Sequence, residues 1–131
     1  MALSDTCAAW APRVLSILRI MTALVLLQHP LSKLFGFPAS NFMPPVGALP
    51  WVAGIIEIVG APLLLIGLFT RPVAFILAGA MAAAYFIGHA PRGFFPQING
   101  GSLAIMYCFV CFYISFAGPG PWSVDAMRGE K

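Results

Sequence analysis

The chain has 131 residues, of which 60% are hydrophobic and only 8% are charged. A soluble domain carries about 25% charged residues, and a disordered chain needs low hydrophobicity, so both classes are excluded. The composition instead predicts an all-α integral membrane protein with a single transmembrane domain over residues 1–131. The formal net charge of +3 comes without a basic patch or an aromatic stacking pattern, so no nucleic-acid partner is expected.

Four segments are apolar and long enough to cross a bilayer, which takes roughly 20 residues of helix. They are residues 14–35, 51–70, 72–90 and 101–118, all with approximate bounds. Pro50 and Pro72 stand at helix starts, where a missing N–H costs nothing. The run Gly118-Pro119-Gly120-Pro121 ends the last helix. We therefore expect a four-helix bundle, in which Thr70 and Arg71 join the second and third helices as a tight hairpin.

Basic residues predict how this bundle is oriented, because cytoplasmic loops are enriched in Lys and Arg. One side holds Arg13, Arg71, Arg128 and Lys131, and the other holds Lys33 and Arg92. Both termini are therefore expected in the cytoplasm. The N-terminus has no signal-peptide pattern, so we expect the first span to stay in the mature protein. The uncharged loop over residues 36–49 is expected in the outer interface, where Phe37, Phe42 and Met43 would cap the bundle.

Each predicted helix carries one stripe of polar and small residues at helical spacing, and the simplest packing points all four stripes inward. The stripes are Arg19, Thr22, Leu26, His29 and Lys33; Gly54, Glu57, Ala61 and Leu64; Ala78, Ala82, Tyr85 and His89; and Ala104, Tyr107, Cys111 and Ile114. Ionisable groups inside a membrane are costly, and each is a functional candidate.

Most of these polar residues lie in the outer half of the bundle, as their depth along the helices shows. With a rise of 1.5 Å per residue, Glu57 lies about 5 Å and His29 about 7 Å above the bilayer centre. Pro30 and Pro62 distort the two helices at this level. We predict a ligand pocket or proton relay, with no assigned catalytic residue, formed by His29, Lys33, Glu57, Tyr85, His89 and Asn99.

Structural explanations compete with this pocket. Glu57 can form a purely structural ion pair with His29 or Lys33, and Lys33 can instead anchor the interface. The distortion of two helices by Pro30 and Pro62 is also compatible with ordinary membrane-helix packing that forms no pocket. Arg19 is expected either in a structural ion pair or snorkelling to the inner headgroups.

The pair Cys108-x-x-Cys111 suggests redox thiols, but it lies in the middle of an apolar helix. Reactive thiols need a helix N-terminus or a nearby cation, so apolar packing is the favoured interpretation. Two histidines on different helices can in principle hold a haem, yet short, Phe-rich helices leave little space for one. One intramembrane glutamate cannot supply a di-iron site, and we expect no metal centre.

Several stretches resemble the DoxX family of small bacterial membrane proteins. They are LRIMTALVLLQHPLSKLFGF (Leu18 to Phe37), IIEIVGAPLLLIGLFTRPVA (Ile55 to Ala74), Gly88-His89-Ala90, NGGSLAIMYCF (Asn99 to Phe109) and GPGPWSVD (Gly118 to Asp125). The family pattern falls on Arg19, His29, Lys33, Glu57, Arg71, His89 and Asn99. Two positions depart from it: Pro30 replaces a usual glycine, and Ser102 stands where many relatives carry a glutamate.

The resemblance implies a multi-pass protein of the bacterial cytoplasmic (inner) membrane with a link to redox or quinone metabolism, because the family is named for a subunit of a thiosulfate:quinone oxidoreductase. Our leading hypothesis is a small redox-associated subunit that binds a quinone-like or other lipophilic ligand in the outer pocket. The alternative is a structural or accessory subunit of a larger membrane redox or photosynthetic complex. A small-solute transporter is disfavoured because the chain has no inverted repeat. Expected partners are the lipid bilayer and membrane or peripheral subunits or further copies of the chain.

Overall fold

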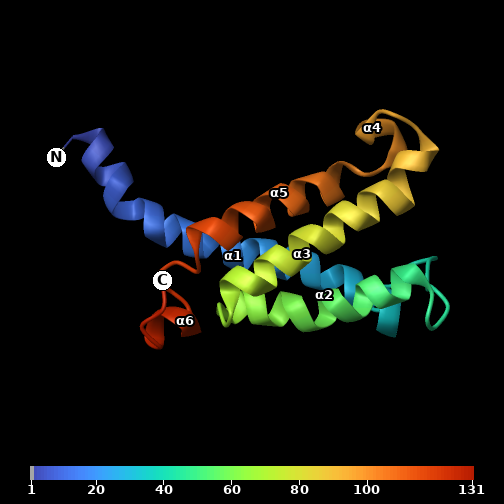
Figure 1. Cartoon of the computed structure of the whole chain (residues 1–131), viewed down its shortest axis with the longest axis horizontal. Helices are drawn as coiled ribbons and strands as arrows, with labels where there is room; N and C mark the ends of the chain where they lie inside the picture. Colours follow the sequence, from blue (N-terminus) through green and yellow to red (C-terminus); the bar gives the residue numbers. More distant parts are fainter. Residues whose placement is uncertain (1) are drawn as a thin grey trace.

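The computed structural model describes residues 2–131, and all regular structure within them is helical, which confirms the all-α class (Figure 1). Four long helices dominate: α1 (Leu3–Phe35), α2 (Leu49–Ile66), α3 (Thr70–Ala84) and α5 (Ser102–Ala117). A π-helical turn η1 (Tyr85–His89) and a 3₁₀ turn η2 (Ala90–Arg92) extend α3, and two short helices, α4 (Pro96–Asn99) and α6 (Val124–Met127), lie at the ends of the bundle.

The long helices are those of a multi-pass membrane protein. Three helical stretches are long and apolar enough to cross a bilayer: Leu3–Phe35, Leu49–Ile66 and Thr70–Arg92. Ser102–Ala117 is a shorter apolar helix. The four predicted helices thus occur in their expected order along the chain, and the first three have the length of membrane spans, whereas the fourth is shorter.

Several boundaries differ from the prediction. The first helix begins at Leu3 rather than near residue 14, because hydropathy marks only the apolar part of a helix. Its first turn is polar but favourable for helix, with Asp5 near the positive end of the helix dipole. The hairpin between α2 and α3 turns at residues 67–69 rather than at Thr70 and Arg71. Gly67 ends α2 in the left-handed conformation (φ 71°), which glycine adopts without steric cost.

The loop over residues 36–48 also differs from expectation. Phe37, Phe42 and Met43 keep 73%, 56% and 57% of their surface exposed, so they do not cap the bundle. Pro44 is the buried residue of this loop. Aromatic side chains here remain available to the membrane interface, where they are commonly found.

The bundle is built from two helix pairs. α1 packs along α2, α3 packs along α5, and the α2–α3 hairpin joins the pairs. Small residues let the helices approach closely: a Cβ added at Gly60 would lie 2.9 Å from Leu77 Cδ2. The core is formed by Ala23, Leu26, Ala61, Leu64, Ala74, Leu77, Ala78, Met81, Tyr107, Cys111 and Ile114. Below, "the α4 end" means the end of the bundle with α4, and "the α6 end" the opposite end with the C-terminus (Figure 1).

Candidate functional site

The inward stripes of α1 and α2 meet in an ion pair inside the bundle. Lys33 Nζ lies 3.2 Å from each of the two carboxylate oxygens of Glu57. The Glu57 side chain is only 2% exposed, whereas that of Lys33 keeps 23% of its surface. Gly54, one turn before Glu57, packs beside the lysine: an added Cβ there would lie 3.7 Å from Lys33 Cδ, an ordinary contact distance. The carboxylate is therefore held among apolar helices by a two-point contact, as a desolvated charge requires.

A histidine and a tyrosine lie beside this pair. His29 is one turn before Lys33 on α1, and its ring meets the ring of Tyr107 of α5 edge-on, with 5.9 Å between the centroids. His29 Nε2 and the Tyr107 hydroxyl are both buried and have no hydrogen-bond partner within residues 2–131. Buried polar atoms are nearly always paired, so these two atoms are the unusual chemical feature of the region. We call His29, Lys33, Glu57 and Tyr107 the polar cluster.

A second polar group at the α4 end is fully paired. The Asn99 amide donates to the Tyr85 hydroxyl at 3.3 Å and to the Gly93 carbonyl at 2.9 Å, and its oxygen accepts from the Gly101 N–H at 2.8 Å. His89 Nδ1 lies 3.1 Å from the Asn99 carbonyl, so this nitrogen carries the proton. The Asn99 network, as we call Tyr85, His89 and Asn99, thus fastens the loop between η2 and α5.

The six residues of the predicted pocket therefore divide into two groups. His29, Lys33 and Glu57 come together, while the Asn99 network is held by its own hydrogen bonds. Within residues 2–131, no hydrogen bond or ion pair links the two groups. Tyr107 was absent from the predicted pocket, although it lies on the inward stripe of the fourth predicted helix. The signal that could have identified Tyr107 is its place on the inward face of an otherwise apolar helix.

Arg19 matches neither sequence-based expectation. Its side chain is fully buried, so it does not snorkel, and no carboxylate of residues 2–131 lies within ion-pair distance. The guanidinium instead donates to backbone carbonyls of Pro119, Trp122 (2.6 Å) and Leu65 (3.4 Å). It thereby joins α1 to the end of α2 and to the segment after α5. The planar fork of arginine, with five donors, suits such a multiple contact.

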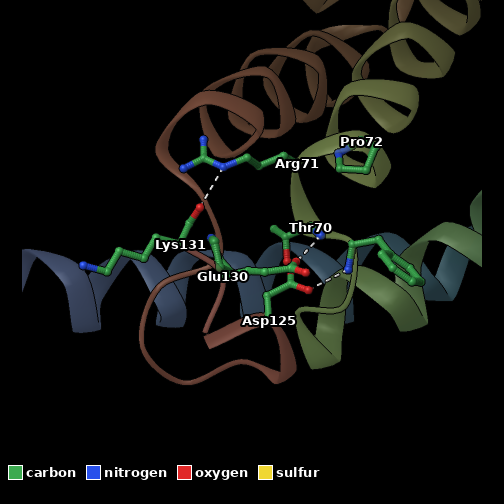
Figure 2. A pocket seen from close by; sticks show the side chains of 8 residues that line it. Thr70, Arg71, Pro72, Asp125, Glu130 and Lys131 are labelled. Atoms are coloured by element: carbon green, nitrogen blue, oxygen red, sulfur yellow. Dashed lines mark hydrogen bonds between the residues drawn. The ribbon is translucent and has the colours of Figure 1, made fainter. Parts of the chain in front are cut away.

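The C-terminal segment folds back onto the α2–α3 turn (Figure 2). The Asp125 carboxylate accepts hydrogen bonds from the N–H groups of Phe69 at 2.9 Å and Thr70 at 2.8 Å, at the start of α3. Burial opposes ionisation of Asp125, but the hydrogen bonds from Thr70 and Phe69 and the charge of Arg128 outweigh it and lower its pKa. This side chain caps a helix that begins 55 residues earlier in the chain.

Arg71 ties the same region to the end of α5. Its Nε donates to the Lys131 carbonyl at 2.9 Å (Figure 2). Its Nη1 donates to the carbonyls of Phe116 and Ser115. A cavity of about 180 Å³ lies between the start of α3 and the C-terminal residues, and a groove of about 760 Å³ lies beside Pro12 of α1. Both are at the α6 end, away from the predicted outer pocket.

The two cysteines of α5 lie in apolar surroundings. Cys111 is fully buried in the core, and Cys108 is half-buried against it. This placement favours packing over the redox role that the sequence left open. Among residues 2–131, no three His, Cys, Asp or Glu side chains gather as a metal-binding group.

The chain is similar to known proteins over most of its length. The DoxX family model matches residues 14–90, a range that contains Arg19, the Lys33–Glu57 pair and His89. An uncharacterized protein of Haemophilus influenzae is 44% identical over 122 residues, which cover 88% of this chain and 91% of that protein. No solved structure matches the chain. The family model covers more than half of the sequence, and the chain therefore belongs to the DoxX family.

Proposed function

We propose that this protein binds a small lipophilic carbonyl compound of the quinone type at the polar cluster. The observation that carries the proposal is the presence of two buried polar atoms without partners, His29 Nε2 and the Tyr107 hydroxyl, beside the Lys33–Glu57 pair. A quinone has carbonyl oxygens that accept hydrogen bonds and an apolar body that dissolves in lipid. Ligand sites are commonly apolar cavities with a few such convergent polar groups.

Each residue of the cluster has a role in this proposal. The Tyr107 hydroxyl donates a hydrogen bond to a ring carbonyl, and His29 donates a second one when its Nε2 is protonated. Glu57 takes up or releases a proton beside the bound ligand, and Lys33 balances the charge of the carboxylate. The exposed part of the Lys33 side chain gives the ligand access from the bundle surface. The Asn99 network supports the neighbouring loop instead of contacting the ligand. The protein would then act as a small redox-associated membrane subunit.

Titration with a decyl-chain benzoquinone tests the proposal. The full-length protein in lipid nanodiscs is titrated, and the bound fraction is read by native mass spectrometry. Tyr107→Phe removes only the hydroxyl, and the loss of one hydrogen bond should weaken binding about 2-fold to 10-fold. Tyr113→Phe is the matched control, because Tyr113 lies on the same helix with 58% of its surface exposed. Absence of saturable binding, or equal weakening by both substitutions, would reject the site.

A structural subunit is the second candidate function. One observation favours it: the Lys33–Glu57 pair joins α1 to α2 and satisfies both charges without a ligand. If Glu57→Gln and His29→Ala leave quinone binding unchanged but abolish assembly with other membrane proteins, the accessory role replaces the ligand-binding role. Blue-native gels of membranes, run beside the quinone titration, separate the two.

A further inference from the structure

The outward face of α1 carries a second regular stripe. Its residues are spaced alternately by four and three positions, and all of them are exposed: Leu3, Cys7, Trp10, Val14, Ile17, Met21, Leu24 and Gln28. The buried residues of the same helix, Ser16, Arg19, Ala23, Leu26 and Pro30, follow the same rhythm on the opposite face. We call the exposed set the α1 outer stripe. It repeats every seven residues, which is the period of helices that pack along one another as a coiled coil.

The first part of this stripe lies outside the bundle. Residues 2–14 are all exposed, and Figure 1 shows the start of α1 extending past the other helices. The helical residues 3–14 span about 18 Å at 1.5 Å each. Leu3 and Trp10 keep 81% and 52% of their surface exposed. A helical segment this short is marginal alone in water, and an apolar side favours packing against a partner.

The membrane part of the stripe contains a polar residue, which points to the kind of partner. Gln28 lies within the stretch of α1 that packs on the bundle, one residue before His29, yet its side chain is exposed on the outer face. A carboxamide facing lipid lacks the hydrogen bonds that water would supply, which is costly. Because the group carries both donors and an acceptor, a second glutamine at the same depth satisfies it.

We propose that two copies of this chain associate through the α1 outer stripe as a parallel dimer. Two copies inserted in the membrane in the same orientation have parallel α1 helices, and a twofold axis makes the contact self-complementary. Cys7, Val14, Met21 and Gln28 share one heptad position, so each faces its own counterpart across the axis. A single polar residue at such a position sets register and helix number in parallel dimers.

Other features of α1 are compatible with this contact. Pro12 and Pro30 lie off the stripe, so no proline ring stands between the helices. Arg13 flanks it, and its guanidinium stays on its own helix, 5.2 Å from the centre of the Trp10 ring and bonded to the Ala9 carbonyl. Lipid alone suits the apolar positions inside the bilayer, but it satisfies neither Gln28 nor the apolar side of residues 3–14. The dimer covers both and is independent of the quinone site.

Cysteine cross-linking in native membranes tests the dimer directly. In a Cys108→Ala, Cys111→Ala background, Cys7 is the remaining thiol, and oxidation with copper phenanthroline should yield a covalent dimer on a non-reducing gel. The matched control adds Cys7→Ser and Ala9→Cys, which moves the thiol to the side away from the stripe and should leave monomer. Equal cross-linking of both variants indicates random collision and overturns the proposal. So does monomer alone when a maleimide shows that Cys7 is accessible.

A second measurement avoids cysteine chemistry. Sedimentation of the full chain in detergent gives the dimer dissociation constant, which Gln28→Leu should raise about 3-fold to 30-fold if the two amides bond across the axis. Gln28→Asn keeps the amide and should retain most of the affinity. Val59→Leu, on α2 with 59% of its surface exposed, is the control for changes to the outer apolar surface. A dissociation constant unchanged by Gln28→Leu, or a chain that is monomeric throughout, overturns the proposal.

Discussion

At the scale of single residues, Glu57 shows how the bundle holds a carboxylate in the middle of an apolar helix. Its side chain is 2% exposed, and Lys33 Nζ lies 3.2 Å from both oxygens. The stability of the protein depends on keeping the pair complete, because removing one member of a buried ion pair leaves the charge of the other without compensation. Replacing both members with apolar groups is often neutral by comparison.

Lys33→Met should therefore destabilise the protein by about 3 kcal/mol or more, since it leaves Glu57 buried without its cation. The double variant Lys33→Met, Glu57→Leu should recover most of this loss. Thermal unfolding in detergent, followed by circular dichroism, measures both. A double variant no more stable than Lys33→Met would show that the pair is not what the substitution breaks.

At the scale of the helices, side chains from distant segments form hydrogen bonds with backbone groups at the helix termini near the α6 end of the bundle. Arg19 donates to the Leu65 carbonyl near the end of α2, and Arg71 donates to carbonyls at the end of α5. The Asp125 carboxylate accepts hydrogen bonds from N–H groups at the start of α3. Cations at helix C-termini and an anion at a helix N-terminus match the helix dipole. The α2–α3 hairpin is thus held by the chain's first and last helical segments.

Asp125 gives this arrangement a pH dependence. Its folded pKa is lowered, so the folded protein binds fewer protons here than the unfolded chain, in which an aspartate titrates at about 3.9. The stabilisation is complete above that pH and is lost as the pH falls through the lower folded pKa. Asp125→Asn should cost about 1 kcal/mol near neutral pH and flatten the fall in stability below about pH 4.

Unfolding by denaturant at a series of pH values, for the wild type and Asp125→Asn, measures this effect. Glu130→Gln is the matched control, because the Glu130 carboxylate is a half-exposed partner of Arg128 in the same segment. If the two variants keep the same acid dependence as the wild type, the cap does not govern it.

At the scale of the whole molecule, the distribution of basic residues predicts the orientation in the membrane. Arg71 contacts the Lys131 carbonyl, and Arg128 lies over the Phe69 ring, so these three basic residues share the α6 end. Lys33 and Arg92 belong to the opposite end. Cytoplasmic sides of membrane proteins are enriched in Lys and Arg, so we expect the α6 end and both termini in the cytoplasm.

Labelling of single cysteines in intact cells checks this orientation. In a chain with Cys7, Cys108 and Cys111 replaced by alanine, Phe42→Cys should react with a membrane-impermeant maleimide without treatment. Glu130→Cys, at an exposed position of the α6 end, should react only after the cells are permeabilised. The reverse pattern would invert the orientation of the bundle.

Much of the fold could be predicted because the membrane itself limits the choices. A spanning helix needs a fixed apolar length, and backbone groups in lipid must be satisfied within the helix. The spans are therefore readable from hydropathy, and the inward stripes from helical spacing. The same helical spacing predicted an ion pair between Lys33 and Glu57 as one of the alternatives for Glu57. Hydropathy does not report where a helix continues outside the bilayer, so the start of α1 was misplaced.

The sequence by itself determined the class of protein, its membrane helices, the inward faces and the scarcity of charge that singles out each buried ion. Only the tertiary structure decided which inward residues meet. Tyr107 joins His29, whereas the Asn99 network closes on itself, and Arg19 reaches carbonyls of Pro119 and Trp122, about a hundred residues away. Periodicity defines the face of a helix but not its neighbour, its rotation or the path of the loop that returns to it. Contacts of this kind depend on all three.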